Sequence, residues 1–306
     1  MSRPLVSIVT PSYNQAEFLE ETIRSVLDQD YQPIEYVVVD GGSTDGSDEI
    51  VKRYEDRLAW WVSEPDRGQA HAINKGFERT SGAYMAYLNS DDTLLLCAVS
   101  RLVGELERDP AASVAYGDAV WLDEHSRRLG RQGAREWDVG AMARSGSAHV
   151  LQPASVWRRE AWDRAGPMDE SLHFTFDSVF FIRMASFARA RYVPEPLAGY
   201  RIHPESKTYS EPIPKLEEYV RVADELFDPV RAPDGLRPHA RAGRASYYRR
   251  AAWGYYNAGE LGTARRLFLR SLALRPWMSA GTARKMARTL LPSPLVRARR
   301  ALRART

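Results

Sequence analysis

Short runs of apolar residues alternate with helical patterns through the first 90 positions of the chain. Residues 6–10, 34–39, 58–62 and 83–88 are rich in Val, Ile, Leu and aromatic residues, which predicts strands. After each of the first three runs, turn residues precede a stretch in which apolar residues recur three or four positions apart, which predicts a helix. Strands that alternate with helices favour right-handed crossovers, so we expect an α/β fold with a Rossmann-like, mostly parallel sheet flanked by helices.

The pattern is less regular between residues 112 and 203. Residues 112–122 predict a strand, and the polar, Arg- and Gly-rich residues 124–146 predict a loop. A short helix is expected over residues 159–165, and a second helix begins near Phe176. Residues 189–203 predict two short strands, which would complete the sheet.

Only helices are expected in the carboxyl-terminal third of the chain. We therefore divide the sequence into an α/β domain over residues 1–209 and an all-helical extension over residues 210–306. Residues 245–258 and 262–274 resemble one tetratricopeptide-type hairpin in the spacing of Ala, Tyr, Gly and Pro. A single hairpin cannot form a solenoid, so we expect it to pack against the first domain or against a second copy of the chain.

Acidic residues follow the predicted strands. In a parallel sheet every strand-to-helix turn opens at the same edge, so these turns share one crevice. The acids expected there would repel one another without a cation, and they are Asp40, Asp45, Asp66, Asp91 and Asp92. Asp91 and Asp92 directly follow the most apolar strand, and we predict that they hold a divalent cation against a phosphate.

The net charge of +3 is unevenly distributed. From residue 261 to the end, the chain has 12 Lys and Arg and no Asp or Glu. Residues 278–306 are basic and amphipathic, and this pattern fits either contact with an anionic membrane or a solvated basic face. Nothing in the sequence points to nucleic acid as a partner.

The compartment can be predicted from the cysteine content and from the apolar runs. Cys97 is the only cysteine, so no intrachain disulfide can form and a reducing compartment is expected. The sequence starts without a charged-then-apolar leader and has no apolar run near the roughly 18 residues that a membrane span needs. We therefore expect a cytoplasmic protein, with the basic tail as a peripheral contact at the inner face of the plasma membrane.

Five motifs occur in an order that resembles a known family. They are residues 6–14 (VSIVTPSYN), 37–45 (VVVDGGSTD), 89–92 (NSDD), 166–169 (GPMD) and 176–177 (FD). Together they resemble the family 2 inverting glycosyltransferases of the GT-A fold, and the likeness covers roughly residues 4–205. The resemblance implies a bacterial enzyme of polysaccharide biosynthesis that uses a nucleotide-diphosphate sugar.

The resemblance also implies a metal site. Mn²⁺ or Mg²⁺ would neutralise the departing diphosphate, and oxygen ligands suit these hard ions. Asp91 matches the last acid of the family's Asp-x-Asp motif and is the first candidate ligand, with Asp92 second. Asn89 replaces the usual leading aspartate, and its amide can still hydrogen-bond to the donor beside Ser90. His203 resembles a position where some relatives add a histidine ligand or a diphosphate contact, and a solvent-facing histidine is the alternative.

The donor nucleotide is expected beside the first two turns. Asp40 matches the acid that accepts from the base in similar enzymes, and Pro11 and Tyr13 match the wall beside it. The alternative for Asp40 is a turn-forming carboxylate, which is common before Gly-Gly. Asp66 and Arg67 are further candidates for donor contacts, and Asp66 could instead cap the following helix.

Inversion needs a base on the acceptor side of the sugar. Asp177 precedes Arg183 by six residues, which is the spacing of the family's catalytic aspartate, and it would deprotonate the acceptor hydroxyl. Neighbouring phenylalanines are expected to desolvate the Asp177 carboxyl and to raise its pKa. The competing interpretation is that Asp177 caps the next helix.

The sequence therefore predicts a metal-dependent inverting glycosyltransferase that acts on a glycan or lipid-linked hydroxyl. A UDP-sugar is the favoured donor and a dTDP-sugar the second. A sugar nucleotidyltransferase would have a similar sheet, but its glycine-rich basic loop is replaced here by residues 11–14. The non-enzyme alternative is an inactive nucleotide-sugar-binding or scaffold protein that acts through its helical tail.

Overall fold

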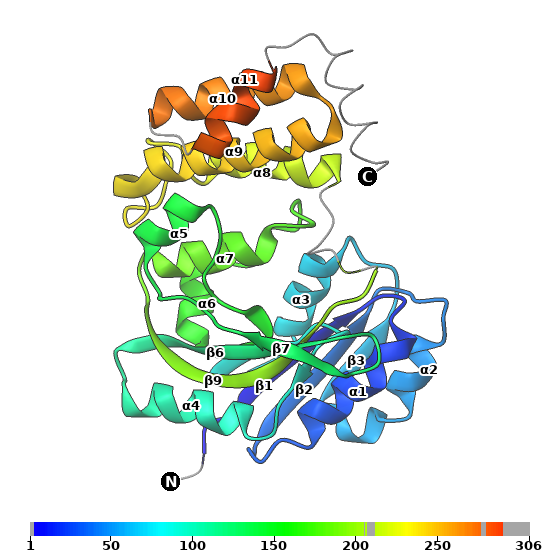
Figure 1. Cartoon of the computed structure of the whole chain (residues 1–306). Coiled ribbons are helices and arrows are strands. Elements are labelled where there is room, and N and C mark those ends of the chain that lie inside the picture. Colours follow the sequence, from blue (N-terminus) through cyan, green and yellow to red (C-terminus); the bar gives the residue numbers. More distant parts are fainter. Residues whose placement is uncertain (1–2, 205, 207–211, 277–279, 290–306) are drawn as a thin grey trace. The chain divides into compact units, whose positions relative to one another are not determined.

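The computed structural model describes residues 3–204, 206, 212–276 and 280–289. The chain divides into two compact units (Figure 1). Unit 1 comprises Met1–Trp137 and His149–Lys207, and unit 2 comprises Asp138–Ala148 and Thr208–Thr306. Segment 138–148 thus groups with the carboxyl-terminal helices, although the chain returns to unit 1 before reaching them.

The amino-terminal half of unit 1 has the expected alternation of strands and helices. The strands are β1 (Val6–Ser12), β2 (Ile34–Asp40), β3 (Trp60–Ser63) and β4 (Tyr84–Tyr87). The helices between them are α1 (Ala16–Leu27), α2 (Ser47–Lys52) with the short 3-10 turn η1 (Glu55–Arg57), and α3 (Gln69–Phe77). All pairings among these four strands are parallel, as the sequence predicts.

The second half of unit 1 makes the sheet mixed. Its strands are β5 (Thr93–Leu94), β6 (Ala112–Leu122), β7 (Arg128–Gln132), β8 (Ser155–Arg158) and β9 (Arg189–Arg201). The helical segments are α4 (Ala98–Arg108), η2 (Gln152–Ala154), α6 (Arg159–Ala165) and α7 (Phe176–Ala185). The sheet order is β3-β2-β1-β4-β8-β6-β9-β5, with β7 paired to β6, and β8 is antiparallel to both of its neighbours.

Two predictions for this half are wrong. Residues 124–146 are not a single loop, because they contain β7 and the helix α5 (Val139–Ser145). The range 189–203 contains one strand, β9, rather than two, and the pairing of β9 with β6 continues through several register shifts. Strand β7 could not be predicted from apolar residues, because its sequence is polar and most of its residues are exposed.

Helices cover both faces of the sheet. One face packs against α1 and α4 through Leu19, Ile23 and Leu102. On the other face α3 approaches β1 closely, since a Cβ on Gly76 would lie 2.4 Å from a methyl group of Val9. Both faces are buried, so the residues at the strand ends are the ones left open to a ligand.

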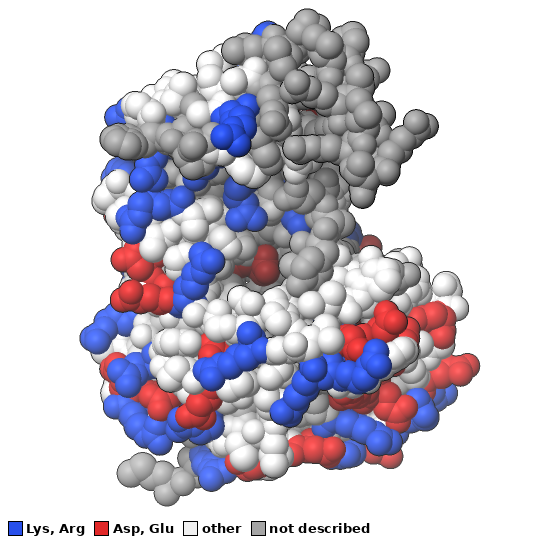
Figure 2. Space-filling view, in the orientation of Figure 1, with Lys and Arg blue, Asp and Glu red and all other residues white. Residues whose placement is uncertain are grey.

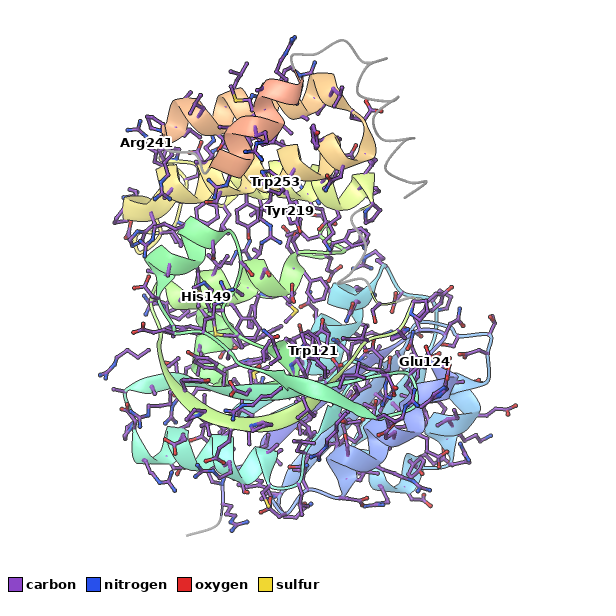
Figure 3. All side chains as sticks on the ribbon, in the orientation of Figure 1. Trp121, Glu124, His149, Tyr219, Arg241 and Trp253 are labelled. Atoms are coloured by element: carbon purple, nitrogen blue, oxygen red, sulfur yellow. The ribbon has the colours of Figure 1, made fainter. Side chains whose placement is uncertain are left out.

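Unit 2 is helical in the residues described. Besides α5 it contains α8 (Ile213–Glu225), η4 (Arg237–His239), α9 (Ala240–Ala258), α10 (Leu261–Leu274) and α11 (Ala280–Thr289). Helices α9 and α10 form the expected hairpin, and Ser271 Oγ donates to the Ala245 carbonyl at 2.7 Å. Tyr219 lies among these helices (Figure 3) and accepts a hydrogen bond from Arg250.

Candidate active site

The carboxyl ends of β1, β2 and β3 are in register, with Ser12 opposite Asp40 and Asp40 opposite Ser63. Asp40 is fully buried. Its two oxygens accept from the hydroxyls of Ser43 (2.5 Å) and Ser63 (2.6 Å) and from the backbone N–H groups of Gly42 (3.2 Å) and Ser43 (2.9 Å). These bonds close the glycine-rich turn, so Asp40 has the turn-forming role predicted from the sequence as the alternative to a base contact. A contact between Asp40 and a nucleotide base stays a prediction.

Tyr13 and Asp66 converge on Gly41. A Cβ on Gly41 would lie 2.7 Å from Asp66 Oδ2 and 3.3 Å from the Tyr13 ring, so only glycine leaves room for both. Tyr13 is 61% exposed, whereas Pro11 is buried within β1. Asp66 Oδ1 accepts from the Gly68 N–H at 2.7 Å, which closes the turn before α3. The exposed ring of Tyr13 and the outer oxygen of Asp66 therefore form one polar-aromatic wall.

Arg67 is directed toward the loop that precedes α7. Its guanidinium donates to Glu170 Oε2 at 2.5 Å, and the side chain is 69% exposed. Glu170 also accepts from Asn74 at 3.1 Å. Burial favours the neutral form of Glu170, but these bonds outweigh it and lower the pKa. Arg67 thus joins the residues after β3 to the GPMD segment.

The first two turns are bonded to each other. Asn14 Oδ1 accepts from the Thr44 N–H at 2.9 Å, and Asp45 Oδ2 accepts from the Ala16 N–H at 2.8 Å, which caps α1 from another segment. Burial favours the neutral form of Asp45, but hydrogen bonds from Ser47 and Ala16 outweigh it and lower the pKa. Asp45 therefore stabilises the rim of the crevice.

Asn89 is held by two glutamines. Its Oδ1 accepts from Gln69 Nε2 at 2.6 Å, and its Nδ2 lies 3.3 Å from Gln152 Oε1. Ser90 is buried, and its carbonyl accepts from the Thr22 hydroxyl at 2.9 Å. The residue in place of the usual leading aspartate thus anchors this turn through its amide. A donor contact through Asn89 or Ser90 stays a prediction.

Asp91 and His203 are side by side. The Oδ2 atom of Asp91 lies 3.1 Å from Nε2 of His203, and the Asp91 side chain is 25% exposed. His203 is 5% exposed at its side chain and packs on Phe18 with ring centroids 4.9 Å apart. The exposed-histidine alternative is therefore wrong, and the structure brings together a carboxylate and an imidazole that lie 112 positions apart in the chain.

Asp92 faces the protein interior. It is 2% exposed, its Oδ1 accepts from the Arg201 N–H at 3.0 Å, and its Oδ2 lies 3.3 Å from Asn89 Nδ2. Burial raises the pKa of Asp92 well above its usual range, and the charge of Asp91 adds to this effect. Because both oxygens contact protein donors, Asp92 supports the turn, and its assignment as a second metal ligand stays a prediction.

The Asp91–His203 pair fits a divalent cation bound together with a diphosphate. Among the described residues, no group of three or more His, Cys, Asp or Glu side chains is arranged to hold a metal. Two side chains are nevertheless enough where phosphate and water oxygens complete the shell, which is the usual arrangement for Mg²⁺ at nucleotides. The carboxylate oxygen of Asp91 suits both ions, whereas the imidazole nitrogen of His203 favours Mn²⁺ over the harder Mg²⁺.

Asp177 lies in the first turn of α7, two residues after the N-cap position. The N-cap position is Thr175, and Asp177 Oδ1 accepts from the N–H of its neighbour Ser178 at 2.6 Å. Burial raises the pKa of Tyr87 well above its usual range, and the charges of Asp177 and Asp92 raise it further. The role of Asp177 as the general base stays a prediction.

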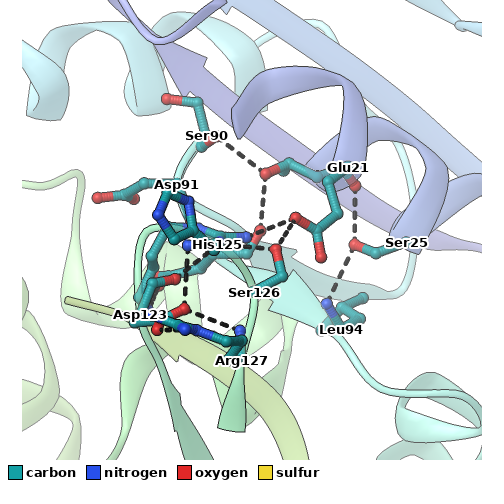
Figure 4. A network of polar contacts seen from close by, with 12 residues as sticks. Glu21, Ser25, Ser90, Asp91, Leu94, Asp123, His125, Ser126 and Arg127 are labelled. Carbon is teal, nitrogen blue, oxygen red and sulfur yellow. Dashed lines mark hydrogen bonds and ion pairs between the residues drawn. The ribbon is translucent and has the colours of Figure 1, made fainter. Parts of the chain in front are cut away.

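Sequence reasoning missed Arg201 and Glu21. Arg201 has a fully buried side chain, and its guanidinium donates to Glu21 Oε2 at 2.7 Å and to the Asp91 carbonyl at 2.8 Å. Figure 4 shows the polar network that joins Glu21 and Ser126 to the Asp91 turn. In the sequence, only the position of Arg201 two residues before His203 indicated that it could lie near the candidate site.

The chain is similar in sequence to known glycosyltransferases. Residues 7–157 match the family model described as glycosyl transferase family 2. A putative teichuronic acid biosynthesis glycosyltransferase, TuaG of Bacillus subtilis, is 45% identical over 93 residues, or 29% of this chain and 37% of that protein. An uncharacterized glycosyltransferase of Nostoc is 26% identical over 274 residues, or 81% and 84% of the two chains.

Solved structures share the fold. S. aureus TarS 1–349 in complex with UDP-GlcNAc has a TM-score of 0.66 at 16% identity, over 93% of this chain and 88% of that one. Mannosyltransferase PcManGT of Pyrobaculum calidifontis, in complex with GDP-Man and Mn²⁺, has a TM-score of 0.56 at 22% identity, over 94% and 79%. The fold and the family match together define a glycosyltransferase of the GT-A type. The chain is similar to the family 2 glycosyltransferases, whose family model matches residues 7–157.

Proposed function

We propose that this protein is a metal-dependent inverting glycosyltransferase that transfers a sugar from a nucleotide diphosphate to a hydroxyl of a glycan or a lipid-linked acceptor. The observation that carries the proposal is the pairing of Asp91 with His203, in which Asp91 Oδ2 lies 3.1 Å from His203 Nε2. Inversion needs a base on the acceptor side of the sugar, and a cation beside the leaving diphosphate would stabilise the charge that develops there.

Asp91 and His203 would hold Mn²⁺ or Mg²⁺. When bound, the ion supplies positive charge to the diphosphate leaving group. Asp91 is the accessible partner, because its side chain is 25% exposed whereas that of His203 is 5% exposed. The imidazole packs on Phe18, and this contact fixes the ring orientation before the donor arrives.

Asp177 would accept the proton of the acceptor hydroxyl as that oxygen attacks the anomeric carbon of the donor. The carboxyl is half-buried and takes part in the first turn of α7, so the helix limits its orientation. Attack from the side opposite the diphosphate inverts the anomeric configuration. Among the acids predicted for the site, Asp177 is the one assigned to the acceptor side.

The nucleotide would lie against Tyr13 and Asp66. The exposed Tyr13 ring offers a stacking surface, and Asp66 Oδ2 lies beside it across Gly41. We favour a UDP-sugar, with a dTDP-sugar second. TarS was solved with UDP-GlcNAc and PcManGT with GDP-Man, so relatives of this fold differ in the base they accept.

The site of action is proposed to be cytoplasmic, at the inner face of the plasma membrane. No helix in the described part of the chain is long and apolar enough to cross a bilayer. Arg265, Arg266 and Arg270 are exposed on α10, and the helical unit has blue side chains on the face shown in Figure 2. The predicted membrane contact involves residues 278–306, most of which lie outside the described residues. The same residues form the end of the helical tail through which a homodimer is predicted.

A donor screen tests the proposal. Thermal shift with UDP-, dTDP- and GDP-sugars, each with and without Mn²⁺, should show one nucleotide that raises the melting temperature more when Mn²⁺ is present. Release of the nucleoside diphosphate from that donor should then require both Asp91 and Asp177. A chain that binds no nucleotide sugar with either ion would instead be the inactive scaffold.

A further inference from the structure

Arg201 is a buried cation that contacts three separate segments of unit 1. Its Nε donates to the Asp91 carbonyl at 2.8 Å. Its Nη1 donates to the Asp123 carbonyl at 3.0 Å and to Ser126 Oγ at 2.9 Å, and its Nη2 donates to Glu21 Oε2 at 2.7 Å. The side chain is 0% exposed, so this charge is satisfied by the protein rather than by water.

Two of the groups that Arg201 contacts are linked to the Asp91–His203 pair: the Asp91 carbonyl and the Phe18 ring. The Arg201 N–H donates to Asp92 Oδ1 at 3.0 Å, so the residue holds the acidic turn through both its main chain and its side chain. The guanidinium lies 4.8 Å from the Phe18 ring centroid, and the same ring packs on His203. Each predicted ligand therefore rests on a group that Arg201 positions.

Glu21 and Ser126 complete the network. Ser126 Oγ donates to Glu21 Oε2 at 2.6 Å, and Ser126 has a positive φ of 61° at the turn between β6 and β7. Glu21 is 46% exposed at its side chain, and its carboxylate compensates the buried charge of Arg201. Helix α1 and the β6–β7 turn are thereby fastened to the metal-binding turn, and Figure 4 shows these contacts.

We propose that Arg201 is a positioning residue that sets the distance between Asp91 and His203, with Glu21 as its counter-charge. This inference rests on the proposed function, because it concerns how that site is held for a cation. A lysine could not replace the arginine, since a single ammonium cannot reach carbonyl, hydroxyl and carboxylate acceptors in three directions at once. Replacing the guanidinium by an ammonium group should therefore make the distance between Asp91 and His203 less well defined, even though the positive charge is kept.

The test compares UDP binding by isothermal titration calorimetry with and without Mn²⁺. In the wild type, Mn²⁺ should tighten UDP binding. Arg201→Lys should reduce that Mn²⁺-dependent gain about 10-fold or more, as for other groups that orient metal ligands, while UDP affinity without metal changes little. Glu21→Gln, at the edge of the network, should cause a smaller loss of the same kind and serves if Arg201→Lys does not fold.

The matched control is Arg131→Lys, which alters a second arginine paired with a buried acid, Asp118, elsewhere in the same sheet. It should lower the melting temperature without changing the Mn²⁺-dependent gain. The positioning role is overturned if Arg201→Lys and Glu21→Gln keep the wild-type gain, or if Arg131→Lys loses it equally. If Mn²⁺ does not change the UDP affinity of the wild type, both this role and the proposed metal site are overturned. If Mn²⁺ tightens UDP binding equally in the wild type and in the two variants, only the positioning role is overturned.

Discussion

His203 Nε2 lies 3.1 Å from Asp91 Oδ2, although 112 positions separate the two residues in the chain. The pair forms where the end of β9 passes the turn after β4, and Phe18 covers the imidazole from α1. The candidate metal site therefore combines a carboxylate oxygen from the acidic motif with an imidazole nitrogen from the end of β9. The predictions below follow from that pairing and from the groups around it.

Removal of either member of the pair should abolish the effect of metal. Asp91→Asn and His203→Gln should each leave UDP binding without metal nearly intact and weaken the Mn²⁺-dependent gain at least about 10-fold, since two side chains supply the protein's share of the shell. Calorimetry at several Mn²⁺ concentrations measures this. Asp28→Asn, which alters an exposed acid at the carboxyl end of α1, is the control and should retain the gain. An unchanged gain in His203→Gln would remove the histidine from the site.

Asp177→Asn should separate binding from chemistry. The amide keeps the shape of the side chain but cannot accept the acceptor's proton, so the transfer rate should fall about 10² to 10⁴-fold while donor affinity stays within a few-fold. Asp163→Asn, an exposed acid on α6, is the control. Turnover near the wild-type rate in Asp177→Asn would assign the base to another residue.

Gly41→Ala should weaken nucleotide binding through sterics alone. The added Cβ would lie 2.7 Å from Asp66 Oδ2 and 3.3 Å from the Tyr13 ring, so the wall proposed for the nucleotide must shift. Gly104→Ala, within α4 and with no atom within 4 Å of its Cβ, should instead stabilise the fold by up to about 1 kcal/mol. UDP affinity and melting temperature measured on both variants check this, and equal UDP affinity in Gly41→Ala would place the nucleotide elsewhere.

Asp45 should make the fold sensitive to acid. Its folded-state pKa is lowered, so its stabilising effect is complete above the unfolded pKa near about 4 and is lost as the pH falls through the folded value. Asp45→Asn should cost about 0.5–1 kcal/mol at pH 7, at the low end for a cap because the residue is exposed, and its stability should fall less below pH 4. Urea unfolding between pH 3 and pH 7 measures both; parallel pH profiles for the two proteins would show that the cap titrates no differently when folded.

The basic face of α10 should contribute to membrane affinity. Arg265→Gln, Arg266→Gln and Arg270→Gln combined should weaken co-sedimentation with phosphatidylglycerol vesicles, since each surface arginine adds about 1 kcal/mol near an anionic bilayer. Neutral phosphatidylcholine vesicles are the control and should bind neither protein. Equal sedimentation of both proteins with the anionic vesicles would show that these arginines form a solvent-exposed basic face and do not contribute to membrane binding.

The sequence predicted much of unit 1 because its signals are local. Apolar runs located β1, β2, β3 and β4 to within a few residues, and the turn residues after them marked one edge of the sheet. The mixed half was harder to predict, since β7 is polar and β9 continues through register shifts that no local pattern reveals. Asp45 shows the same limit: its position at the edge was predictable, but its bond to Ala16 was not.

Long-range pairing explains what the sequence could not show about the site. Arg201 and Glu21 are 180 positions apart, so only the fold brings them into contact. The burial of Asp92 beside an accessible Asp91 was equally hidden, because neighbouring acids look alike in a sequence. The resemblance to a family pointed to Asp91, His203 and Asp177, and the structure adds which groups hold them.

The most direct test of the account is the anomalous X-ray scattering of Mn²⁺ in crystals grown with UDP and MnCl₂. The account predicts one strong peak within bonding distance of Asp91 Oδ2 and His203 Nε2, next to the UDP phosphates, at about 2.0–2.3 Å from each protein ligand. Ordered UDP with the manganese peak elsewhere, or with no peak at all, would contradict it.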